Sequence, residues 1–280
     1  MAEERAAPAA APRSRPSMPW RVLIVFAVAV GLFWFVFHGA PISRSYDRPT
    51  HAVRAMLTTA LVVPVVLVAW RVTDRRPWAE LGLPAPRVAG RHLLLGLVYW
   101  AAPAAVGFGL CLGLGWVEVT PRTSVAEIVG VTALLVVLVF LYEALPEELV
   151  FRGYLQRNLL AALPRWQAVA AQAVLFALFG FLLRVAVTPD RLLVFFAFAL
   201  VLGVFRVATG DIAAGIGFHL AFQTVAQLFD SEGAVFEVSG QATLGVLALG
   251  GLPFTVGWLA MTQFRGERPD WNTPQGWRQV

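Results

Sequence analysis

The sequence contains no lysine, a single cysteine and few charged residues of any kind. Charged residues make up 14% of the 280 positions, whereas soluble domains carry about a quarter, so a water-exposed globular fold is excluded. All 22 basic residues are arginines, scattered with no basic stripe among aromatics, which argues against nucleic-acid binding. Cys111 alone can form no intramolecular disulfide, no Cys-rich metal site and no CxxC redox motif.

The sequence is instead rich in long apolar runs, with 58% hydrophobic residues and a mean hydropathy of +0.69. Each run can cross about 30 Å of hydrocarbon at about 1.5 Å per residue. Unpaired backbone groups are not tolerated in lipid, and the runs lack the two-residue alternation of barrel strands, so the spans should be helices. We predict an all-α polytopic membrane helix bundle of about eight transmembrane helices, at about 20–37, 52–70, 92–117, 126–146, 166–183, 192–208, 210–229 and 240–262.

The chain is expected to form one membrane domain with two polar ends. Residues 1–19, rich in Ala, Pro and Arg, predict a disordered cytoplasmic tail, residues 20–264 the transmembrane domain, and residues 265–280 a polar cytoplasmic tail. Counting arginines in the tails and loops gives 16 on the side of both termini and 6 on the other, so both termini are expected in the cytoplasm. Arginine without lysine and abundant alanine suggest a GC-rich genome, and we expect a bacterial inner (plasma) membrane.

Two features predict how the helices pack and where they meet the membrane surface. Gly109 and Gly113 form a GxxxG pair that would permit close helix approach. Tryptophans near predicted span ends are expected in the interfacial aromatic belts, namely Trp20, Trp70, Trp116 and Trp166.

Ionisable residues within the spans are the candidates for function, because a charge in hydrocarbon costs about 3 kcal/mol or more unless it is paired or hydrated. The end of the fourth span carries Glu143, Glu147, Glu148 and Arg152. On a helix, Glu148 and Arg152 are one turn apart and can form an ion pair, which leaves Glu147 beside Glu143 as a candidate general base. The alternative is a solvated charge cluster at the cytoplasmic end of a helix.

The seventh span, GDIAAGIGFHLAFQ, places His219 and Gln223 one turn apart on a common face. Both side chains can donate hydrogen bonds into a cavity. The alternative is a packed, hydrogen-bonded histidine without a chemical role.

The segment EELVFRGYLQ resembles the EExxxR signature, followed by Gly, of the CPBP intramembrane protease family, which includes the CAAX prenyl endopeptidases and bacterial Abi-type proteins. GDIAAGIGFHLAFQ resembles the HxxxN motif of that family, and the resemblance spans about residues 125–262. It implies a bundle with a membrane-embedded cavity in which Glu147 is the general base, supported by Glu148 and Arg152. His219 and Gln223 would lie on the oxyanion side.

The sequence departs from the family pattern at two places. HxxxN has become HxxxQ, and the FxxxH motif has become Phe176 followed four residues later by Gly180, so its histidine is missing. One hypothesis is that Gly180 leaves a space for a second water or for substrate, in which case Gly180→His would leave cleavage unchanged or raise it. The remaining histidines lie outside the matched region, at His38, His51 and His92.

Two functions are expected from these features. The first is an intramembrane endopeptidase that cleaves peptide bonds near the membrane surface by glutamate-activated water. The alternative is a catalytically impaired, protease-like protein that binds peptides or lipidated tails as an immunity factor, chaperone or partner subunit. A small-solute transporter is disfavoured because we find no inverted repeats with broken helices.

The expected partners are the lipid bilayer and a peptide or lipidated protein, without nucleic acid. No cofactor is expected, and the glutamate-dependent reaction requires no metal, although the sequence leaves a divalent metal open.

Overall fold

The computed structural model describes residues 16–40, 47–229, 234–263 and 269–277. The predicted tail over residues 1–19 falls mostly outside this part, and the first helix already begins at Met18. The described elements are α1 (Met18–Trp34), η1 (Phe35–Gly39), α2 (Arg48–Ala69), η2 (Trp70–Asp74), α3 (Trp78–Leu81), α4 (Pro86–Gly113), β1 (Glu118–Pro121), α5 (Val125–Val139), η3 (Phe140–Ala144), α6 (Leu145–Glu148), η4 (Leu149–Leu155), α7 (Gln156–Leu160), α8 (Arg165–Leu182), α9 (Pro189–Thr209), α10 (Ala213–Leu228), β2 (Phe236–Ser239), α11 (Gln241–Leu244), η5 (Gly245–Gly251) and α12 (Leu252–Gln263), where η marks a π-helical stretch.

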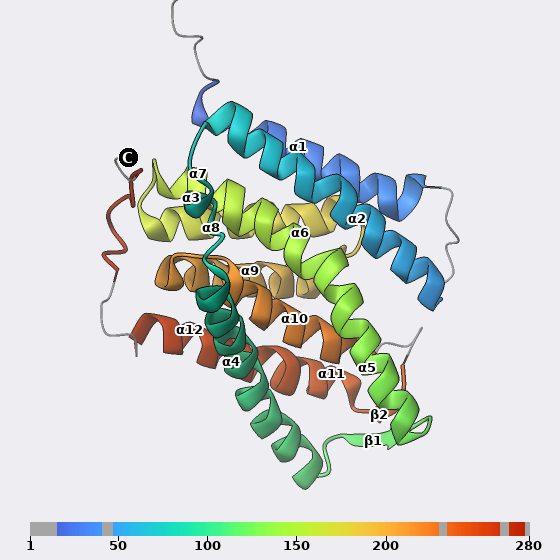
Figure 1. Ribbon diagram of the computed structural model, residues 1–280. Helices are drawn as coiled ribbons and strands as arrows, with labels where there is room; N and C mark the ends of the chain where they lie inside the picture. Colours follow the sequence, from blue (N-terminus) through green and yellow to red (C-terminus); the bar gives the residue numbers. More distant parts are fainter. Residues whose placement is uncertain (1–15, 41–46, 230–233, 264–268, 278–280) are drawn as a thin grey trace, which may run out of the picture.

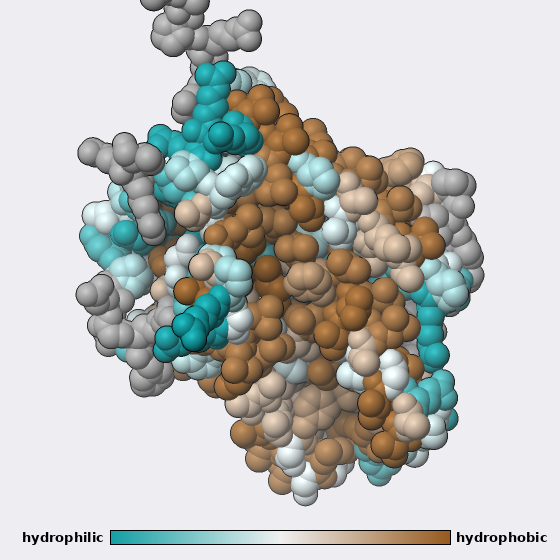
Figure 2. Space-filling model, viewed as in Figure 1, coloured by the Kyte–Doolittle hydropathy of each residue, from teal (hydrophilic) through white to brown (hydrophobic). Residues whose placement is uncertain are grey.

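The all-α membrane bundle predicted from the sequence is confirmed. Seven helical segments of the described chain are long and apolar enough to cross a membrane. The predicted span at 210–229 is α10, a helix of 16 residues that packs inside the bundle, so the count of eight is approximate. Figure 1 shows α1 and α2 along one side of the bundle. Figure 2 shows its apolar surface, with hydrophilic residues toward the end near α3, α7 and the C-terminal segment and also at the opposite edge, near the starts of α2 and α5.

The described residues also form a two-stranded antiparallel sheet that the helical pattern did not anticipate. Strand β1 pairs with β2 in the register Glu118 with Ser239 and Pro121 with Phe236. These strands connect the loop after α4 to the loop after α10, at the end of the bundle where α5 begins (Figure 1).

The contact between α4 and α10 is exceptionally close. A Cβ atom on Gly96 would lie 2.0 Å from the carbonyl oxygen of Ala214, and one on Gly217 would lie 2.0 Å from that of Leu93. Backbone therefore packs on backbone, which only glycine permits at these positions. The interpretation of Gly109 and Gly113 as a packing pair within the chain is wrong. Apart from the neighbouring residues of its own helix, no described atom lies within 4 Å of a Cβ placed on either glycine.

The described C-terminal residues 269–277 dock on the same end of the bundle as the start of α1. The backbone amide of Gln275 donates to the carbonyl of Leu160 at 2.8 Å, and the ring of Trp277 stacks beneath the guanidinium of Arg157, 4.2 Å from the ring centroid. Trp277 also lies beside Trp70, with 6.1 Å between ring centroids. Trp70 is fully buried, so its predicted place in a lipid-facing belt is wrong.

Candidate functional site

The acidic residues predicted from the sequence lie on one continuous helix, Val125–Leu160, whose α-helical hydrogen-bond pattern is broken by π-helical turns, and we call it the broken helix for that reason. The membrane segment Val125–Leu160 changes from α-helical to π-helical geometry at η3, returns to α-helix for one turn at α6, and is π-helical again in η4. Pro146 contributes to this break because its nitrogen cannot donate a helical hydrogen bond. Side chains from other helices bind two carbonyls of this segment, since Thr59 donates to Leu141 and Arg206 Nε donates to the carbonyl of Arg152 at 3.1 Å. Such π-helical turns often occur at functional sites.

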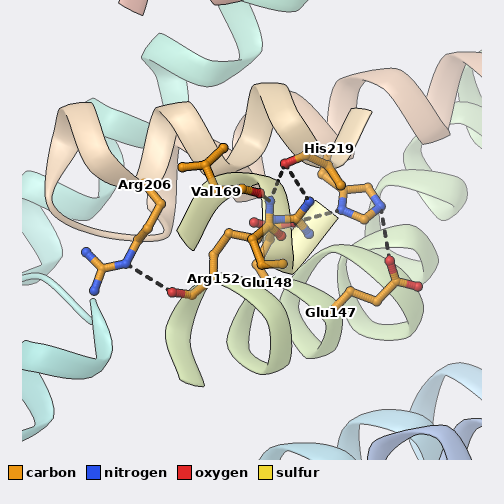
Figure 3. A network of polar contacts seen from close by, with 8 residues as sticks. Glu147, Glu148, Arg152, Val169, Arg206 and His219 are labelled. Atoms are coloured by element: carbon orange, nitrogen blue, oxygen red, sulfur yellow. Dashed lines mark hydrogen bonds and ion pairs between the residues drawn. The ribbon is translucent and has the colours of Figure 1, made fainter. Parts of the chain in front are cut away.

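The predicted ion pair between Glu148 and Arg152 is present and completely buried. Arg152 Nη1 lies 3.0 Å from Glu148 Oε1, and both side chains have no exposed surface (Figure 3). The Arg152 guanidinium also lies 4.8 Å from the centroid of the Phe176 ring. Gly215 allows Glu148 to approach α10, because a Cβ there would be 2.7 Å from Glu148 Oε2. Glu148 is thus held between the broken helix and α10.

His219 joins both members of the diglutamate. Its Nδ1 atom lies 3.3 Å from Glu148 Oε1, and its Nε2 atom lies 3.9 Å from Glu147 Oε2 (Figure 3). The ring of Phe198 packs edge-on against the imidazole, with 4.8 Å between centroids. The side chain of Glu147 is 12% exposed, whereas that of His219 is 1% exposed. Glu147 is therefore the member of the diglutamate that a water or substrate can reach.

Gln223 lies one turn beyond His219, where it contacts a third carboxylate. Its Nε2 atom donates to Glu143 Oε2 at 2.5 Å, and Gln227 Nε2 donates to Glu143 Oε1 at 2.8 Å. Sequence reasoning treated Glu143 only as a neighbour of Glu147 and did not select Gln227. The available signal was the spacing of His219, Gln223 and Gln227, which repeats every four residues along one face of α10.

The position of the missing motif histidine is occupied by a phenylalanine from α9. A Cβ on Gly180 would lie 2.6 Å from two ring atoms of Phe195 and 3.2 Å from Ala186. The hypothesis of a free space beside Gly180 for water or substrate is therefore wrong. The other histidines are engaged elsewhere: His38 contacts the carbonyl of Leu183, His51 packs on Tyr142, and His92 pairs with Asp211.

A second layer of polar residues supports the broken helix from α8 and α9. Gln172 donates to the carbonyl of Ala199 at 2.7 Å, and Arg152 Nη2 donates to the same carbonyl at 3.4 Å. Arg206 also donates to the carbonyl of Glu80 at 3.1 Å. These contacts tie the diglutamate segment to α9 and to the short helix α3.

The acidic residues and His219 do not form a ready metal site. Within the described ranges, no group of three or more His, Cys, Asp or Glu side chains is arranged to hold a metal ion. Glu148 already shares one oxygen with Arg152 and His219, and the oxygens of Glu143 already accept from two amides.

One family model matches the part of the chain that carries this site. Residues 129–225 match the model described as "Type II CAAX prenyl endopeptidase Rce1-like". The match confirms the resemblance to the CPBP family that the diglutamate segment indicated, and it includes all five predicted site residues. No curated protein and no solved structure matches the chain.

Proposed function

We propose that the chain is an intramembrane endopeptidase of the CAAX protease type, in which Glu147 activates a water molecule to cleave a peptide bond. The observation that carries this proposal is the different surroundings of two adjacent carboxylates. Glu148 is buried against Arg152, while Glu147 is partly exposed and faces His219. A paired, buried carboxylate can orient its neighbours, and an accessible one can take a proton from water.

The reaction follows from these roles. Glu147 accepts one proton from water as the water oxygen forms a bond to the carbonyl carbon of the substrate. The carbonyl oxygen becomes an oxyanion, which is stabilised by two hydrogen-bond donors. One is the Gln223 amide, and the other is Nε2 of His219 in its imidazolium form, which carries a proton on both ring nitrogens. The proton then passes from Glu147 to the amide nitrogen as the carbon–nitrogen bond breaks, so that the enzyme returns to its starting state.

The supporting residues keep the donors in place. A carboxylate paired with arginine is a hydrogen-bond acceptor, so Glu148 accepts from His219 Nδ1 and fixes the plane of the ring. The Nε2 atom is thereby directed toward Glu147. The Gln223 amide nitrogen carries two N–H groups, of which one engages Glu143 and the other remains to serve an oxyanion.

The proposed substrate is a membrane-attached peptide or lipidated protein tail. Both described ends of the chain lie at one end of the bundle, where hydrophilic residues gather (Figure 2). The excess of arginines supports a cytoplasmic location for that end, and the proposed membrane is a bacterial inner membrane. Residues 20–264 form the membrane domain in this proposal, with the family-like core at about 125–262.

A second candidate function is a binding protein that has lost turnover. The observation in its favour is Phe195, which fills the space of the missing histidine and leaves the site with one imidazole beside the diglutamate. Such a protein would hold a peptide or lipidated tail at the same residues without cleaving it.

Comparing peptide termini separates the two candidates. Membranes from cells that express the wild type, Glu147→Ala or no protein are analysed by mass spectrometry for new termini. We expect Glu147→Ala to reduce cleavage by about 10²–10⁴-fold, because a general base is lost. Glu127→Ala is the matched control, since Glu127 lies on the same membrane segment but is 48% exposed and pairs with Arg48. Identical termini in all samples, at equal expression, would exclude the protease and favour the binding protein.

A further inference from the structure

Glu143 links the broken helix to α10 one turn away from the diglutamate. Glu147 faces His219, and one turn earlier Glu143 accepts the Gln223 amide at 2.5 Å. Both contacts join the broken helix to α10, and they lie one helical turn apart. Gln227, also on α10, donates through Nε2 to the other oxygen of Glu143 at 2.8 Å.

We infer that Glu143 is a positioning residue that holds the amide of Gln223 in place for the oxyanion, an inference that rests on the proposed function. Glutamine has one more rotatable bond than the asparagine of the HxxxN motif. Ordering a side chain of this length costs conformational entropy. A fixed acceptor at hydrogen-bond distance offsets that cost and selects one orientation of the amide.

The backbone places Glu143 for this task. Glu143 belongs to η3, the π-helical turn that precedes Pro146, and the hydroxyl of Thr59 from α2 donates to the Leu141 carbonyl in the same turn. This turn is therefore attached to α2 on one side and to α10 on the other. Glu143 and Gln223 are both half-buried, so their hydrogen bond competes only in part with water.

The role of Gln223 in the inferred arrangement differs from that of Gln227. Both amides bind the same carboxylate, but Gln223 is one turn from His219 and Gln227 is two turns away. Gln227 helps to hold the Glu143 carboxylate in place, whereas Gln223 is the amide that Glu143 orients toward the oxyanion. Gln227→Ala thus removes a comparable hydrogen bond without removing the inferred oxyanion donor.

A double-mutant cycle tests the inference in the full-length protein reconstituted in lipid nanodiscs, with a synthetic peptide that spans a cleavage junction found in the comparison of termini as the substrate. The variants are Glu143→Ala, Gln223→Asn and their combination, with Gln227→Ala as the matched control. Misplacing a donor by about 1 Å can cost up to about 10²-fold in rate, so we expect Glu143→Ala to lower kcat by about 10- to 100-fold with KM unchanged. The shorter Gln223→Asn side chain no longer reaches Glu143, so adding Glu143→Ala to it should cost little more. Gln227→Ala should lower kcat by less than about 10-fold, and Glu143→Gln, which keeps one acceptor oxygen, should fall between Glu143→Ala and the wild type.

A second measurement does not depend on cleavage. In protein labelled with ¹⁵N-glutamine, the side-chain amide signal of Gln223 is assigned by its loss in Gln223→Asn. We expect slow hydrogen exchange of this amide in the wild type and in Gln227→Ala, and fast exchange in Glu143→Ala. Unchanged exchange in Glu143→Ala, or additive losses of kcat in the cycle, would overturn the inference. A third outcome is a wild type that does not cleave, together with faster exchange of the Gln223 amide in Glu143→Ala. It would overturn the proposed function but support the positioning of Gln223 by Glu143.

Discussion

The close contact between α4 and α10 makes a strong prediction about Gly217. A Cβ added there would lie 2.0 Å from the carbonyl oxygen of Leu93, whereas real Cβ atoms essentially never approach another atom within 3.0 Å. Gly217→Ala must therefore separate the two helices by about 1 Å, the difference between these distances. The opposing atom belongs to the backbone and cannot rotate away, so relief requires movement of a whole helix.

This movement would affect stability and activity together. Overpacking of this kind costs about 1–3 kcal/mol, and we expect the free energy of unfolding of Gly217→Ala to fall by at least that amount. Gly217 precedes His219 by two residues on α10, so the shift would also change the 3.9 Å approach of His219 to Glu147. A displacement of about 1 Å can reduce the rate by about 10²-fold.

The assay is thermal unfolding of purified protein in nanodiscs, with cleavage measured on the same samples. Gly109→Ala is the matched control, because Gly109 lies in α4 and an added Cβ would meet no described atom within 4 Å. Alanine is the better helix former, so this control should keep or raise the melting temperature. A Gly217→Ala protein that is as stable as Gly109→Ala would refute the reasoning from backbone contact.

Two further predictions concern other packed positions. Gly180→His should destabilise the protein without improving cleavage, because Phe195 occupies the space that the imidazole would need. Adding Phe195→Ala to the same chain should open that space and restore stability. Melting temperatures of the single and double variants check this, and a Gly180→His variant as stable as the wild type would contradict it. Trp277→Ala should lower the free energy of unfolding by about 1–3 kcal/mol, since it loses the stack on Arg157 and apolar contact area. Trp20→Ala, at an exposed position, should change it little in the same melting experiment.

The bundle and much of the site could be predicted from the sequence because both depend on local spacing. Apolar runs fix the spans, and a separation of four residues on a helix brings Glu148 to Arg152 and places His219 in line with Gln223. These relations hold within a single helix whatever the rest of the fold does. The resemblance to the family adds only that the diglutamate and His219 belong to one site.

Contacts between helices could not be predicted in the same way. The pattern of small residues drew attention to Gly109 and Gly113, whereas the glycines that pack α4 on α10 are Gly96 and Gly217. Spacing shows that close approach is possible but not which face of a helix meets a neighbour. Trp70 is a similar case, because it lies at a span end like a belt residue but is covered by Trp277, some 200 positions later in the chain.

The different environments of Glu147 and Glu148 show why the division of labour at the site also needs the three-dimensional structure. The two residues are chemically identical neighbours, and successive side chains on a helix point about 100° apart. One carboxylate therefore enters the core toward Arg152, and removing its partner would leave an uncompensated buried charge at a cost of about 3–5 kcal/mol. The other remains partly exposed beside His219. Since Phe195 closes the place of the missing histidine, the proposed reaction assigns proton transfer to groups on α10 and the broken helix, and Glu147 is the partly exposed carboxylate among them.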